Sequence, residues 1–119
     1  MKLQLKRAYE SPTKGDGTRL LVDRLWPRGV TKESAKIDHW LKEIAPSTVL
    51  RKWFSHDPAK WTEFRRRYWR ELDQNESAVT QLKDFLRGKS VTLVYGAKDT
   101  EHNHAVALKE YLESKHARP

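Results

Sequence analysis

The fold of this chain is decided by the stretch Leu20-Leu21-Val22-Asp23-Arg24-Leu25-Trp26-Pro27-Arg28-Gly29, in which an aliphatic run passes directly into a charged loop. Aliphatic residues without polar alternation predict a strand that is covered on both faces, as in a parallel sheet between helices. Pro27 and Gly29 end such a strand, because proline lacks the ladder N–H and glycine favours turns. We therefore expect an α/β fold in which this strand spans about residues 19–25.

A second aliphatic run, Val91-Thr92-Leu93-Val94-Tyr95, also ends in polar residues, and it passes through Gly96 into the segment 97–104. The carboxyl ends of parallel strands meet at one edge of a sheet, and ligands of such sheets bind at that edge. Two polar clusters are therefore predicted to share one rim.

The remaining segments predict one more strand and several helices. Leu3 and Leu5 alternate with polar residues, which indicates a strand near the amino terminus. Thr31 is a candidate N-cap for a helix that carries Ile37, Trp40, Leu41 and Ile44 on one face and ends before Pro46. Further helices are expected after Ser47, after Asp57-Pro58, up to Gly88, and from about 102 to 113.

This order predicts a single small layered α/β domain over residues 1–119. Its central sheet should be short and mostly parallel, with about three or four strands flanked by helices. The long helical segment should form an insertion between the second and third strands.

The composition excludes several classes of protein. The chain has 119 residues and no cysteine, so a disulfide framework, a thiolate metal site and a cysteine nucleophile are all excluded. The amino terminus lacks the apolar region of a signal peptide, and no apolar stretch approaches the length needed to span a membrane. We expect a cytoplasmic protein with no membrane partner.

The formal net charge of +8 raises the possibility of a nucleic-acid partner, because clustered basic residues neutralise phosphates. The basic excess is largest within the first thirty residues. In the basic segment 65–70, Glu63, Arg67 and Glu71 fall four residues apart, which is typical of a salt-bridged, solvent-facing helix.

The first polar cluster contains Asp23, Arg24, Trp26 and Arg28. Two guanidinium groups beside a strand end can bind a phosphate or carboxylate through paired hydrogen bonds. Alternatively, Asp23 and Arg24 could form an ion pair that fixes the following turn. Trp26 could offer a stacking surface to a ligand or could simply pack into the core.

The second cluster contains Lys98, Asp99, His102, Asn103 and His104. It precedes a helix, whose free N–H groups favour anions, and an Asp with a His can perform acid/base chemistry. The alternative is that Asp99 or Asn103 caps that helix. Neither a Rossmann nor a P-loop glycine pattern is present, and His102 and His104 are wrongly spaced for a metal pair, so we predict no cofactor and no metal.

Taken together, the segments 23–29, 41–47, 50–58 and 92–105 resemble the YeaO-like proteins, a bacterial family of unknown function. The likeness spans nearly the whole chain and is most specific in the Asp23 to Gly29 and Ala45-Pro46-Ser47 segments. It implies a small, cytoplasmic, single-domain protein, and it supplies no reaction, cofactor or catalytic residue.

The leading hypothesis is a pocket at the strand carboxyl ends that binds a small phosphate- or carboxylate-bearing ligand, with acid/base catalysis left open. The competing hypotheses are a nucleic-acid-binding or regulatory module and a protein-interaction domain without a small ligand. The expected ligand contacts, with Arg7 added because it follows the first strand, are Arg7, Arg24, Trp26, Arg28, Lys98 and Asn103, and the acid/base candidates are Asp23, Asp99, His102 and His104.

Overall fold

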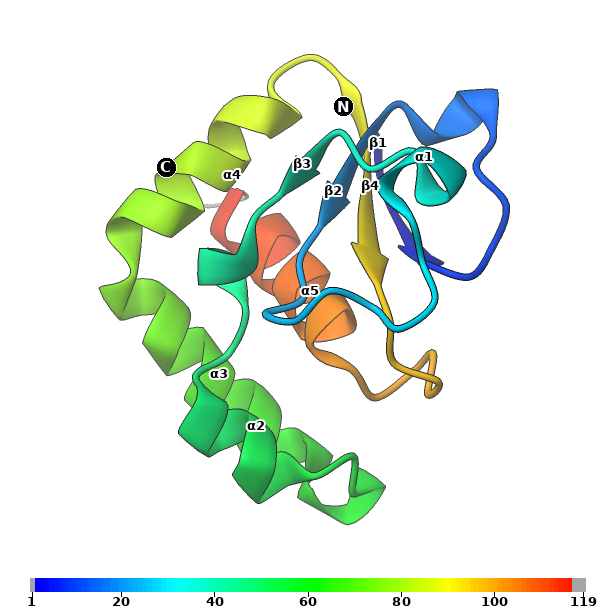
Figure 1. Cartoon of the computed structure of the whole chain (residues 1–119). Helices are drawn as coiled ribbons and strands as arrows, with labels where there is room; N and C mark the ends of the chain where they lie inside the picture. The colour runs from blue at the N-terminus through cyan, green and yellow to red at the C-terminus, as the bar shows by residue number, and fades with distance from the viewer. Residues whose placement is uncertain (1, 117–119) are drawn as a thin grey trace.

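The computed structural model describes residues 2–116 and contains a four-stranded sheet of order β1-β4-β2-β3 in which every pair of neighbours is parallel (Figure 1). The predicted α/β class and parallel sheet are confirmed. Tyr95 pairs with Arg7 and Val94 pairs with Leu21, so β1, β4 and β2 end at the same edge. The strands are β1 (Lys2–Arg7), β2 (Thr18–Leu21), β3 (His39–Trp40) and β4 (Ser90–Tyr95).

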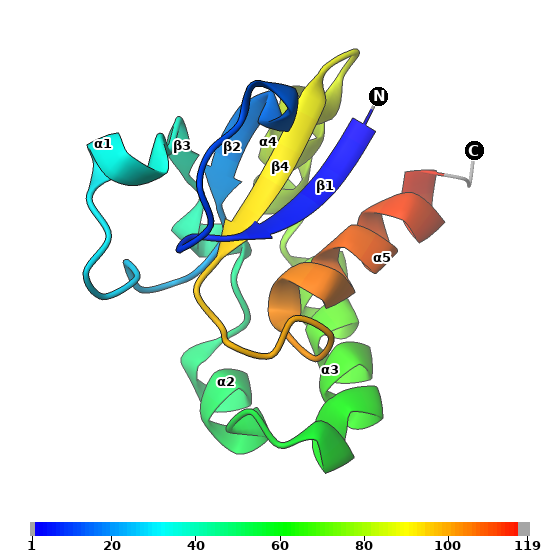
Figure 2. The same ribbon diagram turned by 90° about the vertical axis from the view of Figure 1, so that its right-hand side faces the viewer.

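Helices cover both faces of the sheet, and α2 lies beyond the carboxyl ends of the strands (Figures 1 and 2). Leu20 and Leu93 point into the large cluster that packs against α3, α4 and α5, whereas Leu21 and Val94 point into a small cluster with Ala35 of α1. The α-helices are α1 (Lys32–Ala35), α2 (Thr48–Phe54), α3 (Trp61–Gln74), α4 (Glu76–Leu86) and α5 (His104–His116), and the 3-10 turns are η1 (Lys14–Asp16), η2 (Lys42–Ile44) and η3 (Pro58–Lys60).

The prediction of one helix from Thr31 to about Ile44 is wrong. Thr31 does cap a helix by accepting a hydrogen bond from the Ser34 N–H, but that helix ends at Ala35, and Lys36 adopts a left-handed backbone with φ of 49°. The chain then forms β3, in which Trp40 is 39% exposed rather than part of a buried helical stripe. Ile37, Leu41 and Ile44 are buried as expected, but Ile37 and Leu41 lie on either side of β3 and Ile44 lies in η2.

The open edge of β2 explains this difference, because it offers backbone partners that a helix over residues 36–44 would leave unused. Asp38 N–H donates to the Arg19 carbonyl at 2.9 Å, and Leu41 N–H donates to the Leu21 carbonyl at 2.8 Å. The third strand is therefore β3, and the long helical segment lies between β3 and β4, rather than between the second and third strands.

The helix starts predicted at Ser47 and Asp57 are confirmed. Ser47 Oγ accepts from the Leu50 N–H at 3.1 Å, and Asp57 Oδ1 accepts from the Ala59 N–H at 3.0 Å. Within residues 2–116, no helix is long and apolar enough to cross a membrane.

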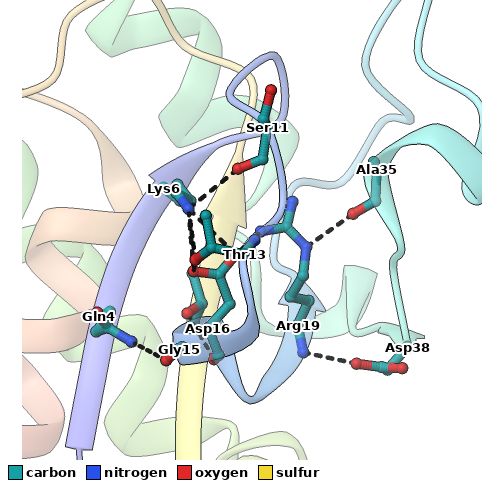
Figure 3. A network of polar contacts seen from close by, with 10 residues as sticks. Gln4, Lys6, Ser11, Thr13, Gly15, Asp16, Arg19, Ala35 and Asp38 are labelled. Carbon is teal, nitrogen blue, oxygen red and sulfur yellow. Dashed lines mark hydrogen bonds and ion pairs between the residues drawn. The ribbon is translucent and has the colours of Figure 1, made fainter.

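A buried ionic network ties the amino-terminal strands together (Figure 3). The Asp16 carboxylate accepts from Arg19 Nη1 at 2.6 Å and from Lys6 Nζ at 3.0 Å, and it also accepts from the Thr13 N–H at 3.0 Å. Arg19 Nε donates to the Ala35 carbonyl at 2.7 Å. The Asp16 carboxylate thus links β1, η1 and β2, and Arg19 extends the network to α1.

The environment of Asp16 lowers the pKa of its carboxyl group. Burial alone would raise the pKa of this carboxyl group, but the hydrogen bonds from the Thr13 N–H, Lys6, the Thr13 hydroxyl and Arg19 outweigh burial and hold the pKa far below its usual range. Because the folded-state pKa lies below that of the unfolded chain, the carboxylate stabilises the fold above about pH 4 and this contribution is lost as the pH falls further.

We expect Asp16→Asn to lower the urea midpoint at pH 7, and we expect the difference from wild type to shrink between about pH 4 and pH 3. Asp84→Asn, at a mostly exposed carboxylate, is the matched control and should show little difference at either pH. A pH-independent difference for Asp16→Asn would contradict the role assigned to its ionised form.

Candidate functional site

A cavity of about 310 Å³ opens at the carboxyl ends of β2 and β4. Its walls come from the loop after β2, the turn after β4, the start of α5, and α2 with the segments on either side of it. The cavity therefore lies at the shared rim that was predicted from the ends of the two aliphatic runs. The lining residues are Tyr9, Asp23, Arg24, Leu25, Trp26, Pro27, Arg28, Ala45, Pro46, Arg51, Phe54, His56, Phe64, Gly96, Ala97, Asn103 and His104.

Asp23 lies in the cavity wall, where it connects the ends of both central strands. Its Oδ2 accepts from the Gly96 N–H at 2.9 Å, and its Oδ1 lies 3.1 Å from His104 Nε2. Oδ1 is buried and makes no well-aligned hydrogen bond, since the His104 ring is directed toward the Val22 carbonyl. The carboxylate thus joins β2, β4 and α5 through one hydrogen bond and one close contact with the His104 ring.

The surroundings of His104 determine which of its ring nitrogens carries hydrogen. Nε2 lies 3.1 Å from the Val22 carbonyl oxygen and 3.1 Å from Asp23 Oδ1. Both neighbours are acceptors, so Nε2 must be protonated to avoid repulsion between lone pairs. His104 therefore serves as a donor to the end of β2 through this nitrogen.

Arg24 does not form the ion pair with Asp23 that was one of the two sequence interpretations. Its Nη2 donates to the Ala45 carbonyl at 3.2 Å, and its Nε donates to the Pro46 carbonyl at 3.4 Å. Arg24 thereby holds the segment before α2 against the loop after β2, and part of its side chain lines the cavity.

Two further arginines, Arg28 from the loop after β2 and Arg51 from α2, line the cavity and are exposed. Among residues 2–116, neither guanidinium group has a hydrogen-bond or ion-pair partner. His56 joins them from the turn after α2, where its backbone φ is 57°. Arg51 and His56 were not among the predicted site residues, because their place depends on how α2 folds back over the strand ends.

Trp26 packs mainly as a structural residue, although it borders the cavity. Its Nε1 donates to the Val30 carbonyl at 2.6 Å, and its ring meets the Trp40 ring edge-on at a centroid distance of 5.4 Å. These contacts fix the loop that carries Arg28.

Four of the predicted site residues lie outside the cavity lining. Arg7 turns back to donate from Nε to the Ala97 carbonyl at 2.8 Å, and Lys98 does not line the cavity. Asp99 accepts from the N–H groups of Glu101 and His102 at 2.9 Å, which holds its pKa below the usual range. His102 pairs with Asp99 through Nδ1 and packs edge-on against Trp61.

Asn103 lines the cavity and is buried. It caps α5, which was one of the two interpretations of this residue. Its Oδ1 accepts from the Val106 N–H at 3.0 Å, and its Nδ2 donates to the Asp99 carbonyl at 2.8 Å. In the part of the chain that the structure describes, no group of three His, Asp or Glu side chains could hold a metal ion.

The family description "Inactive DUF488-N3 subclade" matches residues 2–119. The chain belongs to the DUF488 family. The Uncharacterized protein YeaO of Escherichia coli is 45% identical to this DUF488 protein over 114 residues, which cover 96% of this chain and 99% of the relative. An uncharacterized protein of Mycobacterium bovis is 34% identical, with 96% of each chain covered. The predicted resemblance is confirmed, and no solved structure matches this protein.

We expect Asp23→Ala to lower the free energy of unfolding of this DUF488 protein by about 2 kcal/mol, the scale of hydrogen bonds to a mostly buried charged group. The side chain of Asp23 is 17% exposed, against 33% for Asp99, which also pairs with a histidine. Asp99→Ala is therefore the matched control and should have a smaller effect. Urea denaturation followed by tryptophan fluorescence measures both, and equal midpoints for the two variants would disprove the linking role of Asp23.

Proposed function

We propose that this DUF488 protein binds a small phosphate- or carboxylate-bearing ligand in the cavity at the strand carboxyl ends. The observation that carries the proposal is the pair Arg28 and Arg51, whose guanidinium groups come from different elements, line one cavity and have no protein partner among residues 2–116. Unpaired guanidinium groups bind oxyanions well, since their planar N–H groups match two oxygens at once.

The charge balance of the lining also favours an anion. The lining holds three arginines, Arg24, Arg28 and Arg51, and a single carboxylate, that of Asp23. The Asp23 carboxylate already accepts the Gly96 N–H and lies against the His104 ring, and even when ionised it balances only one of the three arginines. A net positive cavity therefore remains for a ligand of opposite sign.

We infer binding without bond cleavage, and two observations support this. The acid/base candidates Asp99 and His102 lie outside the lining, while Asp23 and His104 contact each other and the strand ends. The family description of the matching subclade also carries the word "inactive". Lys98 and Arg7 were predicted to contact the anion, but they lie outside the lining. In this proposal Arg51 makes that contact.

The nucleic-acid alternative has less support, because three of the four arginines in the basic segment 65–70 are held in ion pairs with Glu63 and Glu110. Arg66 and Arg67 both bind Glu63 at 2.7 Å, and Arg65 lies 3.3 Å from Glu110. Phosphate binding along α3 would have to break these pairs, although each exposed pair is individually weak.

Titration with inorganic phosphate, followed by amide chemical shifts, tests the proposal. Shifts are expected at Gly96, Arg28 and their neighbours. Arg28→Gln and Arg51→Gln should each weaken binding by about tenfold, because each removes a charge-assisted hydrogen bond.

Lys52→Gln is the matched control, since it removes one exposed positive charge from α2 at a residue that does not line the cavity. Equal weakening by Lys52→Gln would mean that net charge alone attracts phosphate. A response to a DNA duplex alone, lost at high salt, would favour the nucleic-acid alternative, and no response to either would leave a protein-interaction domain.

A further inference from the structure

The cavity that carries the unpaired arginines also has exposed apolar side chains in its lining. The structure describes four large hydrophobic residues as exposed, and two of them, Tyr9 and Leu25, line this cavity. Leu25 is 64% exposed and Tyr9 is 50% exposed. Single exposed apolar residues need no explanation, but two that line one cavity mark a binding surface.

Neither side chain is left exposed by a poorly ordered loop. Arg24 and Trp26, on either side of Leu25, are fixed by hydrogen bonds to the carbonyls of Pro46 and Val30. The Tyr9 hydroxyl donates to the Arg28 carbonyl at 2.8 Å, and the Arg7 guanidinium lies 4.9 Å from the Tyr9 ring centroid. Contacts at the cavity therefore hold the loop that carries Leu25 and the Tyr9 side chain itself.

These contacts also place the apolar surface beside the cationic one. The bond from the Tyr9 hydroxyl to the backbone of Arg28 makes the two residues neighbours, and Leu25 precedes Arg28 by three residues in the same loop. The volume of about 310 Å³ exceeds what one oxyanion needs and falls at the lower end of small-molecule pockets, which run from roughly 300 to 1,000 Å³. Pro27, Pro46 and Phe54 extend the apolar wall inward.

We propose that the ligand is an aromatic anion, in which a flat ring carries the phosphate or carboxylate. This inference rests on the proposed function: the anion would bind Arg28 and Arg51, and the ring would lie against Leu25 and Tyr9. A ring of this kind uses the exposed apolar surface, which an inorganic anion would leave in water.

The test compares phenyl phosphate with methyl phosphate, which has a similar charge but no ring, in amide-shift titrations of the full chain. Phenyl phosphate should bind about tenfold more tightly, the gain expected when roughly 55 Å² of apolar surface leaves water. Leu25→Ser should remove most of this preference while leaving the affinity for methyl phosphate close to that of wild type.

Val49→Ser is the matched control, because Val49 is 80% exposed and does not line the cavity. It should leave the preference intact. Tyr9→Ser provides a second variant with the same expected loss of preference, in case Leu25→Ser fails to fold.

The possible failures can be told apart. Equal affinities for the two esters would overturn the aromatic inference and leave the proposed function standing. Binding of neither ester would overturn both. A preference for phenyl phosphate that survives in both Leu25→Ser and Tyr9→Ser would show that the ring lies elsewhere, and phenol binding as tightly as phenyl phosphate would overturn the role of the anion.

Discussion

The carboxylate of Asp23 is the contact on which the geometry of the cavity depends. It accepts the Gly96 N–H at the end of β4 and meets His104 at the start of α5. Its own backbone carbonyl accepts from Trp40 Nε1 at 2.7 Å, which joins the end of β3 to the same point. The ends of β3 and β4 and the start of α5 therefore converge on one residue directly after the buried run of β2. A charge in this position is tolerated because partners fixed by the fold surround it.

The central strands and their common edge could be predicted from the sequence. The aliphatic runs that begin at Leu20 and Val91 have no polar alternation, which indicates strands buried on both faces. That argument also brought together Asp23, Arg28 and His104, which do line one cavity. The family could be predicted as well, from sequence segments such as 23–29 and 45–47.

The third strand could not be predicted in the same way. The spacing of Ile37, Trp40 and Leu41 fits a helical face, and nothing local in the sequence shows that β2 has an unpaired edge nearby. Tertiary pairing decides this segment, and the left-handed Lys36, which carries no glycine signal, ends the helix early. Arg51 was missed for a related reason, because α2 reaches the cavity only through the folding of the whole helical segment. Asp99 and His102, by contrast, follow β4 closely but are held in a capped turn outside the cavity.

The cavity has two parts with different origins. Asp23, Gly96 and His104 belong to the sheet and the helix packed against it, and their mutual contacts leave little freedom for change. Arg51 and His56 belong to α2 and its following turn, and the Arg51 side chain makes no hydrogen bond or ion pair within residues 2–116. Substitutions at these α2 positions can alter the charge and shape of the opening without disturbing the sheet. The opening of the cavity and the framework beneath it are therefore separable parts of the structure.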